Sequence, residues 1–311
     1  AGVLAANIRA LQTELDGGSI TLGDIERNAG QLDAAAGDSG AGSFGGELRL
    51  IEQEFPETPS LVYDGPFSEH IKTASPRFLE GLGEVSENQA RRAAAAFTGI
   101  SEGKLCLTGE SAGEMPCYWF SAEVSGGTVS AAVTKTGGVV TNMLSSRIPA
   151  ERTVSAAEAE RAAIRFLESR GFEGMAETYR IEQGGVITIN FAYKQDGVLC
   201  YSDLVKVSVA GDTGAVCGYE AMGYIMSHCR RELPEPSVSA AQARMAVPEG
   251  LTLLSEQPAL VPSSGRYERL CWELKCSDEN ERHCLIYVNA ETGEQEKILL
   301  LLEDETGTLA I

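Results

Sequence analysis

One motif occurs three times in this chain, and it constrains the fold more than any other feature of the sequence. The copies read VSENQARRAAAAF from Val85, VSAAEAERAAIRFL from Val154 and VSAAQARMAV from Val238. Each copy places a serine three residues before a glutamine or glutamate, in the pairs Ser86 with Gln89, Ser155 with Glu158, and Ser239 with Gln242. This spacing is typical of the capping box, in which the two side chains bond backbone N–H groups that a first helical turn leaves free. The sequence therefore predicts three helices, each capped by its serine.

Strand-like segments follow each predicted helix. Apolar residues alternate with polar ones there, which is the pattern of a strand with one buried face. The alternating residues are Tyr118, Phe120, Ala122 and Val124 in the first copy, Ile187, Ile189, Phe191 and Tyr193 in the second, and Leu270, Trp272, Leu274 and Cys276 in the third. Each copy then reaches a Thr-Gly turn, where positive φ is expected at Gly137, Gly214 and Gly293. The capping serine and the turn glycine are 51, 59 and 54 positions apart, so we predict three units of similar length.

The predicted fold class is α+β, with three tandem units that each pack one helix on a small antiparallel β-sheet. We expect a short N-terminal helical segment at 1–60, a linker at 61–84, and units at 85–150, 151–232 and 233–311. In the third unit, Pro248 is expected to end the helix a turn or two early. The chain starts at Ala1 without an initiator methionine or a signal pattern, so we interpret it as a trimmed fragment that has lost N-terminal residues.

The charge balance excludes two classes of partner. The chain has 25 Lys and Arg against 45 Asp and Glu, which gives a formal net charge of −20. Nucleic acid binding draws most of its affinity from clustered cations, and an anionic membrane surface also attracts cations. We therefore expect no nucleic acid partner, and contact with a membrane only through an anchor absent from this chain.

The most unusual stretch is YDGPFSEHI, between the N-terminal segment and the first unit. An Asp-Gly-Pro turn separates two aromatic residues there, and an adjacent glutamate and histidine follow. The candidate site residues are Tyr63, Asp64, Gly65, Pro66, Phe67, Glu69 and His70. Carboxylate and imidazole groups are suited to acid–base or metal chemistry, but the sequence supplies no matching third partner. We predict a pinned structural hinge, with a partner-binding surface as the alternative.

We predict no catalytic residue, no bound metal and no cofactor. HExxH and P-loop motifs are absent, and the chain has only three histidines that could serve as bases. The eight cysteines are scattered through strand-like segments. A zinc site built from Cys271, Cys276, His283 and Cys284 would have the wrong spacing for the knuckle motifs, which favours buried free thiols.

The two tryptophans occupy similar places in the first and third copies. Trp119 and Trp272 each belong to an early strand of the predicted sheet. Large aromatic residues dominate small cores, so core filling is expected for both. Exposed anchors for a partner are the alternative interpretation.

A helix with an (S/T)-x-x-x-A opening, antiparallel strands, and a strand ending in a Thr-Gly turn together resemble the PepSY domain. Three such units, preceded by helices and by PSLVYDGPFSEHI, resemble the YpeB family of spore germination proteins from endospore-forming bacteria. The resemblance covers essentially the whole chain, and Tyr63 to Ile71 is its most specific part. It implies three PepSY-like units and a non-enzymatic accessory protein.

The same resemblance implies a location in the spore and a protein partner. Proteins of the family have an N-terminal membrane anchor and lie in the spore envelope, outside the inner membrane and near the cortex. The implied partner is a cortex-lytic hydrolase of the SleB type, which the accessory protein stabilises, localises or restrains during germination, with peptidoglycan as a further partner. A PepSY-type protease inhibitor or propeptide-like module is the alternative function.

Overall fold

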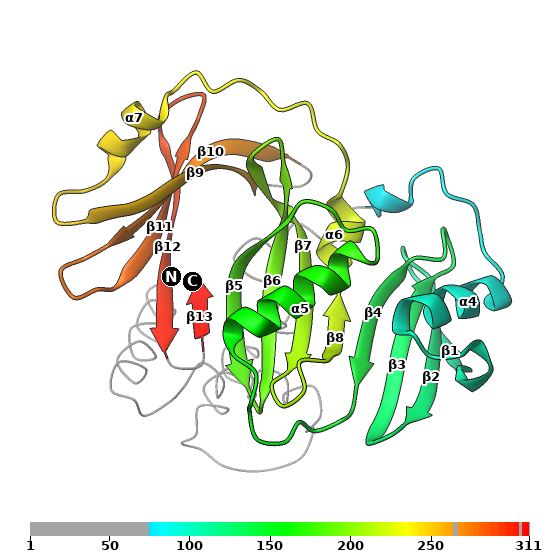
Figure 1. Ribbon diagram of the computed structural model, residues 1–311. Helices are drawn as coiled ribbons and strands as arrows, with labels where there is room; N and C mark the ends of the chain where they lie inside the picture. Colours follow the sequence, from blue (N-terminus) through cyan, green and yellow to red (C-terminus); the bar gives the residue numbers. More distant parts are fainter. Residues whose placement is uncertain (1–74, 264–266, 305–306, 311) are drawn as a thin grey trace, which may run out of the picture.

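The computed structural model describes residues 75–263, 267–304 and 307–310 (Figure 1). The predicted helical segment 1–60 and the stretch Tyr63 to His70 lie outside these residues. No helix in the described part of the chain is long and apolar enough to cross a membrane. The secondary structure falls into three consecutive segments, and each contains a capped α-helix followed by strands.

In each segment a capped α-helix comes before four or five strands. The first segment consists of η2 (Arg77–Leu79), α4 (Glu87–Thr98), η3 (Glu102–Lys104), β1 (Cys106–Glu110), β2 (Cys117–Val124), β3 (Gly127–Thr134) and β4 (Val140–Ser145). The second consists of α5 (Ala156–Glu168), β5 (Met175–Gln183), β6 (Val186–Gln195), β7 (Val198–Ala210), β8 (Val216–Glu220) and α6 (Met222–Ser227). The third consists of α7 (Ala240–Ala243), η4 (Arg244–Ala246), β9 (Thr252–Pro262), β10 (Glu268–Ser277), β11 (His283–Asn289), β12 (Gln295–Asp304) and β13 (Gly307–Ala310).

All three predicted capping boxes are formed. The serine hydroxyl accepts a hydrogen bond from the backbone N–H three residues on, and the Gln or Glu side chain accepts one from the serine N–H, at Ser86, Ser155 and Ser239. The helices differ in length, since α4 has 12 residues and α5 has 13, whereas α7 has 4. In the third segment η4 replaces the missing helical turns and Pro248 follows it, which agrees with the expected early end.

The strands form one 13-stranded sheet in place of three small ones. β4 pairs with β8, and β13 pairs with β5, so the segments share a continuous ladder. A parallel pairing of Leu199 and Cys200 with Ala259 and Leu260 joins β7 to β9. This pairing closes eight strands, β5 to β7 and β9 to β13, into a ring, from which β8 and β1 to β4 extend as an open wing (Figure 1).

The predicted α+β class is confirmed in this coarser form, a large mixed sheet with few helices. Three separate helix-on-sheet units are not confirmed. Strands at the edges of the predicted small sheets pair across the segments, because a row of free backbone N–H and C=O groups is satisfied by the nearest strand. The residue boundaries predicted for the linker and the three units stay predictions.

The last hairpin of each segment has the same construction. The hairpins are β3–β4, β7–β8 and β11–β12, and equivalent residues face each other across 12 positions in the pairs Ala131 with Met143, Val207 with Tyr219, and Ile286 with Ile298. The turn glycines Gly137, Gly214 and Gly293 have φ of 78°, 71° and 77°, in the region where only glycine is unstrained. The three Thr-Gly signals of the sequence therefore mark three hairpins of identical register.

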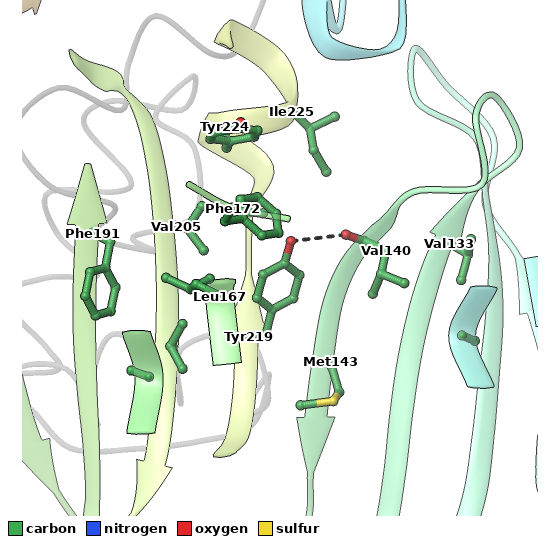
Figure 2. Close-up of a cluster of buried hydrophobic side chains, with 14 of the residues drawn as sticks. Val133, Val140, Met143, Leu167, Phe172, Phe191, Val205, Tyr219, Tyr224 and Ile225 are labelled. Atoms are coloured by element: carbon green, nitrogen blue, oxygen red, sulfur yellow. Dashed lines mark hydrogen bonds between the residues drawn. The ribbon is translucent and has the colours of Figure 1, made fainter. Parts of the chain in front are cut away.

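The main hydrophobic core lies between the sheet and the helices α4 and α5 (Figure 2). Each helix turns its alanines toward the sheet at a spacing of four residues, and the fully buried ones are Ala90, Ala94, Ala159 and Ala163. Tyr219 of β8 lies at the centre, with its ring centroid 4.7 Å from that of Phe97 and 6.0 Å from that of Phe166. In the third segment the equivalent residue, Ile298, is 43% exposed, because α7 is too short to cover it.

Candidate functional site

Most of the residues singled out in the sequence do not meet in one place. The stretch from Tyr63 to His70 lies outside the described residues. The capping serines and turn glycines belong to three separate segments and serve the backbone locally. No group of three or more His, Cys, Asp or Glu that could hold a metal is present among the described residues. The eight cysteines are free thiols, and most of them are buried.

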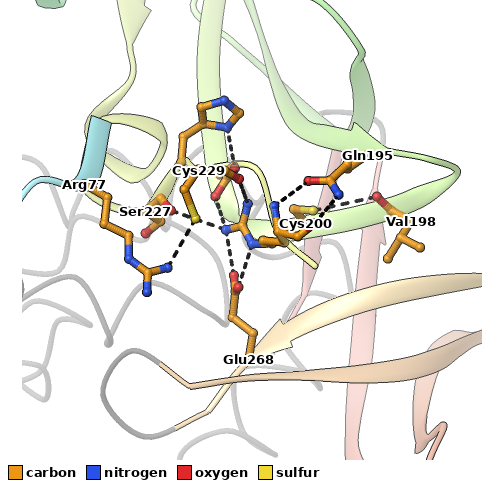
Figure 3. A network of polar contacts seen from close by, with 10 residues as sticks. Arg77, Gln195, Val198, Cys200, Ser227, Cys229 and Glu268 are labelled. Atoms are coloured by element: carbon orange, nitrogen blue, oxygen red, sulfur yellow. Dashed lines mark hydrogen bonds and ion pairs between the residues drawn. The ribbon is translucent and has the colours of Figure 1, made fainter. Parts of the chain in front are cut away.

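The structure instead gathers polar side chains where the second segment meets the third (Figure 3). The guanidinium group of Arg231, which follows α6, donates to both carboxylate oxygens of Asp203 on β7, at 2.8 and 2.6 Å. It also donates to both oxygens of Glu268 on β10, at 2.6 and 2.8 Å. The side chains of Arg231 and Asp203 are 7% and 0% exposed. One arginine thus binds carboxylates from two different segments.

The backbone of Arg231 is held as firmly as its side chain. Its N–H donates to the side-chain oxygen of Gln195 at 2.9 Å, and its carbonyl accepts from the amide nitrogen of Gln195 at 2.7 Å. The guanidinium group donates further to the carbonyl of Cys229 at 3.1 Å. Arg77 of η2 reaches the same place, where its guanidinium group lies 3.5 Å from the sulfur of Cys229. The junction therefore connects all three segments.

His228 completes the cluster on its other side. Its Nδ1 lies 2.7 Å from an oxygen of Asp203. Its ring stacks on Tyr224 at a centroid distance of 4.0 Å and meets Tyr193 edge-on at 4.7 Å. A histidine oriented by a carboxylate is also found in catalytic triads, where the imidazole must contact a nucleophile. Within the described part of the chain, Asp203 is the hydrogen-bond partner of His228 and aromatic rings pack against the imidazole, so this arrangement suits a structural clamp.

Burial and the neighbouring carboxylates shift the pKa of Arg231 in opposite directions. Burial alone favours the neutral guanidine, but the hydrogen bonds to Asp203 and Glu268 outweigh it and raise the pKa of Arg231. The group is therefore a permanent cation between two carboxylates. Such buried pairs are satisfied only when every partner is present, because removing one leaves a charge without compensation in a dry environment. We call Arg231, Asp203, Glu268 and His228 the junction clamp.

A second polar cluster lies inside the strand ring. Glu273 of β10 is 6% exposed, and its carboxylate accepts hydrogen bonds from the hydroxyls of Tyr201 and Tyr287 at 2.5 and 2.8 Å. The amide of Gln257 donates to its other oxygen at 2.8 Å. Burial, and then the nearby carboxylate, raise the pKa of Tyr201 well above its ordinary value. One carboxylate on β10 thus binds side chains from three other strands of the ring, β7, β9 and β11.

An open groove lies on the sheet face opposite α4 and α5. It has a volume of about 390 Å³ and crosses β2, β3, β4, β8, β7 and β6. Its lining includes Trp119, Ser130, Asn142, Leu144, Ser208 and Gly218. Trp119 is 36% exposed and Leu144 is 62% exposed. This groove could receive a ligand.

Sequence reasoning did not find the junction clamp or the groove. The partners of Arg231 lie 28 and 37 positions away, so no local spacing indicates them. One signal was present: Asp203 interrupts the apolar pattern of β7, and a buried carboxylate requires a compensating partner. For Trp119, the expectation of core filling is not met, because it faces the groove.

Comparisons with known proteins agree with one another. The family model described as YpeB sporulation, PepSY1 and PepSY2 domains matches residues 44–234. The chain is similar to the sporulation protein YpeB of Halalkalibacterium halodurans, with 35% identity over 175 residues, 56% of this chain and 38% of that protein. Its similarity to the sporulation protein YpeB of Oceanobacillus iheyensis is 31% identity over 220 residues, 69% of this chain and 48% of that protein. The chain thus spans less than half the length of these curated relatives.

A solved structure supports the fold. The Bacillus megaterium YpeB C-terminal domain superposes with a TM-score of 0.62 and 24% identity, over 70% of this chain and 98% of that one. At this identity the likeness is evidence for shared architecture alone.

Proposed function

From the premise that this chain belongs to the YpeB sporulation protein family, we propose that it is a non-enzymatic accessory protein of spore germination. In this role it stabilises, localises or restrains a cortex-lytic peptidoglycan hydrolase of the SleB type. The proposed place is outside the inner membrane, next to the cortex. The net charge of −20 supports a role that does not depend on anionic lipid or nucleic acid.

The observation that best supports this role is that the charged groups of the junction clamp bind one another. Arg231 binds Asp203 and Glu268, and His228 binds Asp203. These buried charges thus hold segments together. A rigid body made of joined segments suits recognition of a partner, because partners bind best to surfaces that need no ordering on contact.

We propose further that the third segment is a PepSY-like unit, as are the two that the family model matches. The shared hairpin register supports this, since Ile286 with Ile298 repeats the spacing of Val207 with Tyr219. The capping box at Ser239 supports it as well. The third unit differs in its short helix, α7, and in its place in the strand ring.

The stretch from Tyr63 to His70 lies within the part of the chain that the family model matches. We propose that it is a hinge that also faces the hydrolase. Replacing Asp64, Glu69 and His70 together by alanine is expected to weaken protection of the hydrolase while leaving the free energy of unfolding unchanged. If the variant protected the hydrolase as well as the parent does, this stretch would not be part of the interface.

The proposed role is tested by measuring muropeptide release from purified cortex. Three samples are compared: this protein alone, the cognate SleB-like hydrolase alone, and the two together. We expect no release by this protein alone, and a changed rate or a longer active lifetime of the hydrolase in the mixture. Release by this protein alone would overturn the non-enzymatic role. Tight inhibition of unrelated peptidases would instead favour the protease-inhibitor alternative.

A further inference from the structure

We propose that the outer face of the third segment binds residues 3–16 of this same chain as an amphipathic helix. The outer face is the side of β9 to β12 that carries α7, and its uncovered part is formed by Ile298 and Leu300 of β12. Both partners belong to one polypeptide, so this inference does not rest on the accessory role. It follows from a comparison of the three segments.

One position of the last hairpin is covered in two segments and uncovered in the third. Met143, Tyr219 and Ile298 are the equivalent residues, since their hairpins have the same register. Met143 is 7% exposed and Tyr219 is 4% exposed, whereas Ile298 is 43% exposed. In Figure 1, α5 crosses the strands of the second segment, while α7 lies at one end of the third. The third segment thus keeps the sheet of the others but lacks much of their helical cover.

The uncovered residues continue a buried apolar row. In the β11–β12 ladder Leu300 pairs with Cys284, and Ile298 pairs with Ile286, so each pair lies on one side of the sheet. Cys284 and Ile286 are buried in the cluster that includes α7. Leu299, between the two uncovered residues, is buried in the cluster inside the strand ring. The apolar row therefore runs from the core beneath α7 out to β12, where it meets solvent.

The local sequence prevents α7 from covering this row. α7 and η4 have 4 and 3 residues and together are about 12 Å long, whereas the 13 residues of α5 are about 20 Å long. Pro248 comes two residues after η4, and it lacks the N–H that a further helical turn would need. The missing cover must therefore come from another part of the chain or from a partner.

Residues 3–16 have the sequence of such a cover. They lie outside the described residues, so the assignment rests on their pattern. Large aliphatic residues recur there at helical spacing and form one stripe, with Gly17 and Gly18 to end the helix. The stripe consists of Val3, Leu4, Ile8, Leu11 and Leu15. Its length is close to the 12 and 13 residues of α4 and α5, the helices that cover the other two segments.

The connection to the face favours residues 3–16 over other occupants. A chain spans up to about 3.3 Å per residue, so the stretch from Gly17 to Ser75 is long enough to reach the face. A linked segment has a high effective concentration, whereas a second copy or a separate partner must bind at its concentration in solution. The next apolar stripe, at positions 22–32, is weaker because one of its four residues is an alanine.

Hydrogen–deuterium exchange of the full chain, read by peptide mass spectrometry, tests the proposal. A docked helix protects its backbone amides, so residues 3–16 should exchange slowly in the parent. Replacing Ile298 and Leu300 together by serine removes the apolar contact at two half-exposed positions. This change is expected to speed the exchange of residues 3–16 by about tenfold or more. Peptides from α4 report whether the rest of the fold is intact, and their exchange should not change.

Ile148→Ser is the matched control, because Ile148 is 87% exposed and lies outside β12. It should leave the exchange of residues 3–16 as in the parent. Three results would overturn the proposal: equal exchange of residues 3–16 in the parent and the double variant, a response of residues 22–32 alone, or protection that disappears on dilution, which would assign the face to a second copy. The assay contains no hydrolase, so its outcome is independent of the proposed function.

Discussion

Arg231 holds the carboxylate of Asp203 through two hydrogen bonds of 2.8 and 2.6 Å, and the two side chains are 7% and 0% exposed. The same guanidinium group binds Glu268 from the third segment. Because the contact joins β7 to β10, it fixes how the second and third segments sit together. The rigid body proposed for partner recognition depends on that arrangement.

Replacing Arg231 by methionine is expected to destabilise the protein strongly. The substitution keeps much of the side-chain volume but leaves Asp203 and Glu268 as buried carboxylates without a cation. Breaking a buried pair in this way typically costs about 3 to 5 kcal/mol of the free energy of unfolding. Urea unfolding followed by circular dichroism measures the difference.

The adjacent Arg230 provides the control. Its side chain is 82% exposed and lies 3.8 Å from Asp196, so Arg230→Met is expected to change the free energy of unfolding by less than about 0.5 kcal/mol. Equal effects of the two substitutions would show that the junction clamp does not contribute to stability.

Asp212 gives a prediction about the stability of the protein at acid pH. Its carboxylate accepts hydrogen bonds from the Arg147 guanidinium group at 2.8 and 2.7 Å and from the N–H of Ala150 at 2.8 Å. These bonds, with the Arg147 contribution the largest, lower the pKa of Asp212. A lowered pKa means that the ionised group stabilises the fold above the ordinary aspartate pKa of about 3.9, and that this contribution is lost as the pH falls toward the folded-state pKa.

The Asp212→Asn variant isolates this effect. The free energy of unfolding is measured for both proteins from neutral pH down into the acid range. We expect the parent to be more stable at neutral pH and the difference to shrink below about pH 4. A difference that does not vary with pH would contradict the assigned role of the carboxylate.

Gly293 is expected to resist substitution because of its backbone. Its φ of 77° lies in the left-handed region, where a side chain costs about 1 to 2 kcal/mol. Gly293→Ala should lower the urea midpoint accordingly. Gly83→Ala is the control, since Gly83 has no left-handed φ and an added Cβ would meet no described heavy atom within 4 Å. Equal midpoints for the two variants would show that the turn tolerates a side chain.

The thiols should differ sharply in reactivity. Burial raises the pKa of Cys200 and Cys271 to about 12. Cys106, by contrast, is exposed. Because the thiolate is the reactive form, iodoacetamide at mildly alkaline pH should label Cys106 in the folded protein and leave Cys200 and Cys271 unmodified. Peptide mass spectrometry reads the result, with urea-unfolded protein as the fully labelled control. Rapid labelling of Cys200 in the folded state would contradict the buried position.

Local features of this fold could be predicted from the sequence. The cap at Ser155 depends on residues within one helical turn, and the turn at Gly214 depends on the conformational freedom of one residue. Such short-range signals survive in any tertiary context, and both features are present in the structure. The three helix starts and the three hairpin turns could therefore be predicted from the sequence.

Features that depend on long-range pairing could not be predicted. Whether the small sheets join into one depends on which strand edges lie next to each other in the folded protein. Leu199 of β7, for example, pairs with Ala259 of β9. The junction clamp depends on partners 28 and 37 positions apart. The exposure of Trp119 depends on register, since a shift of one residue moves a side chain from the core face to the open face. None of these has a signature in local spacing.

The most direct test of the accessory role is sedimentation velocity of this protein mixed with the cognate SleB-like hydrolase. We predict a species that sediments faster than either protein alone, and loss of that species when the junction clamp is broken by Arg231→Met but not when Arg230 is replaced. Independent sedimentation of the two proteins at every mixing ratio would contradict the proposal that this chain contacts the hydrolase.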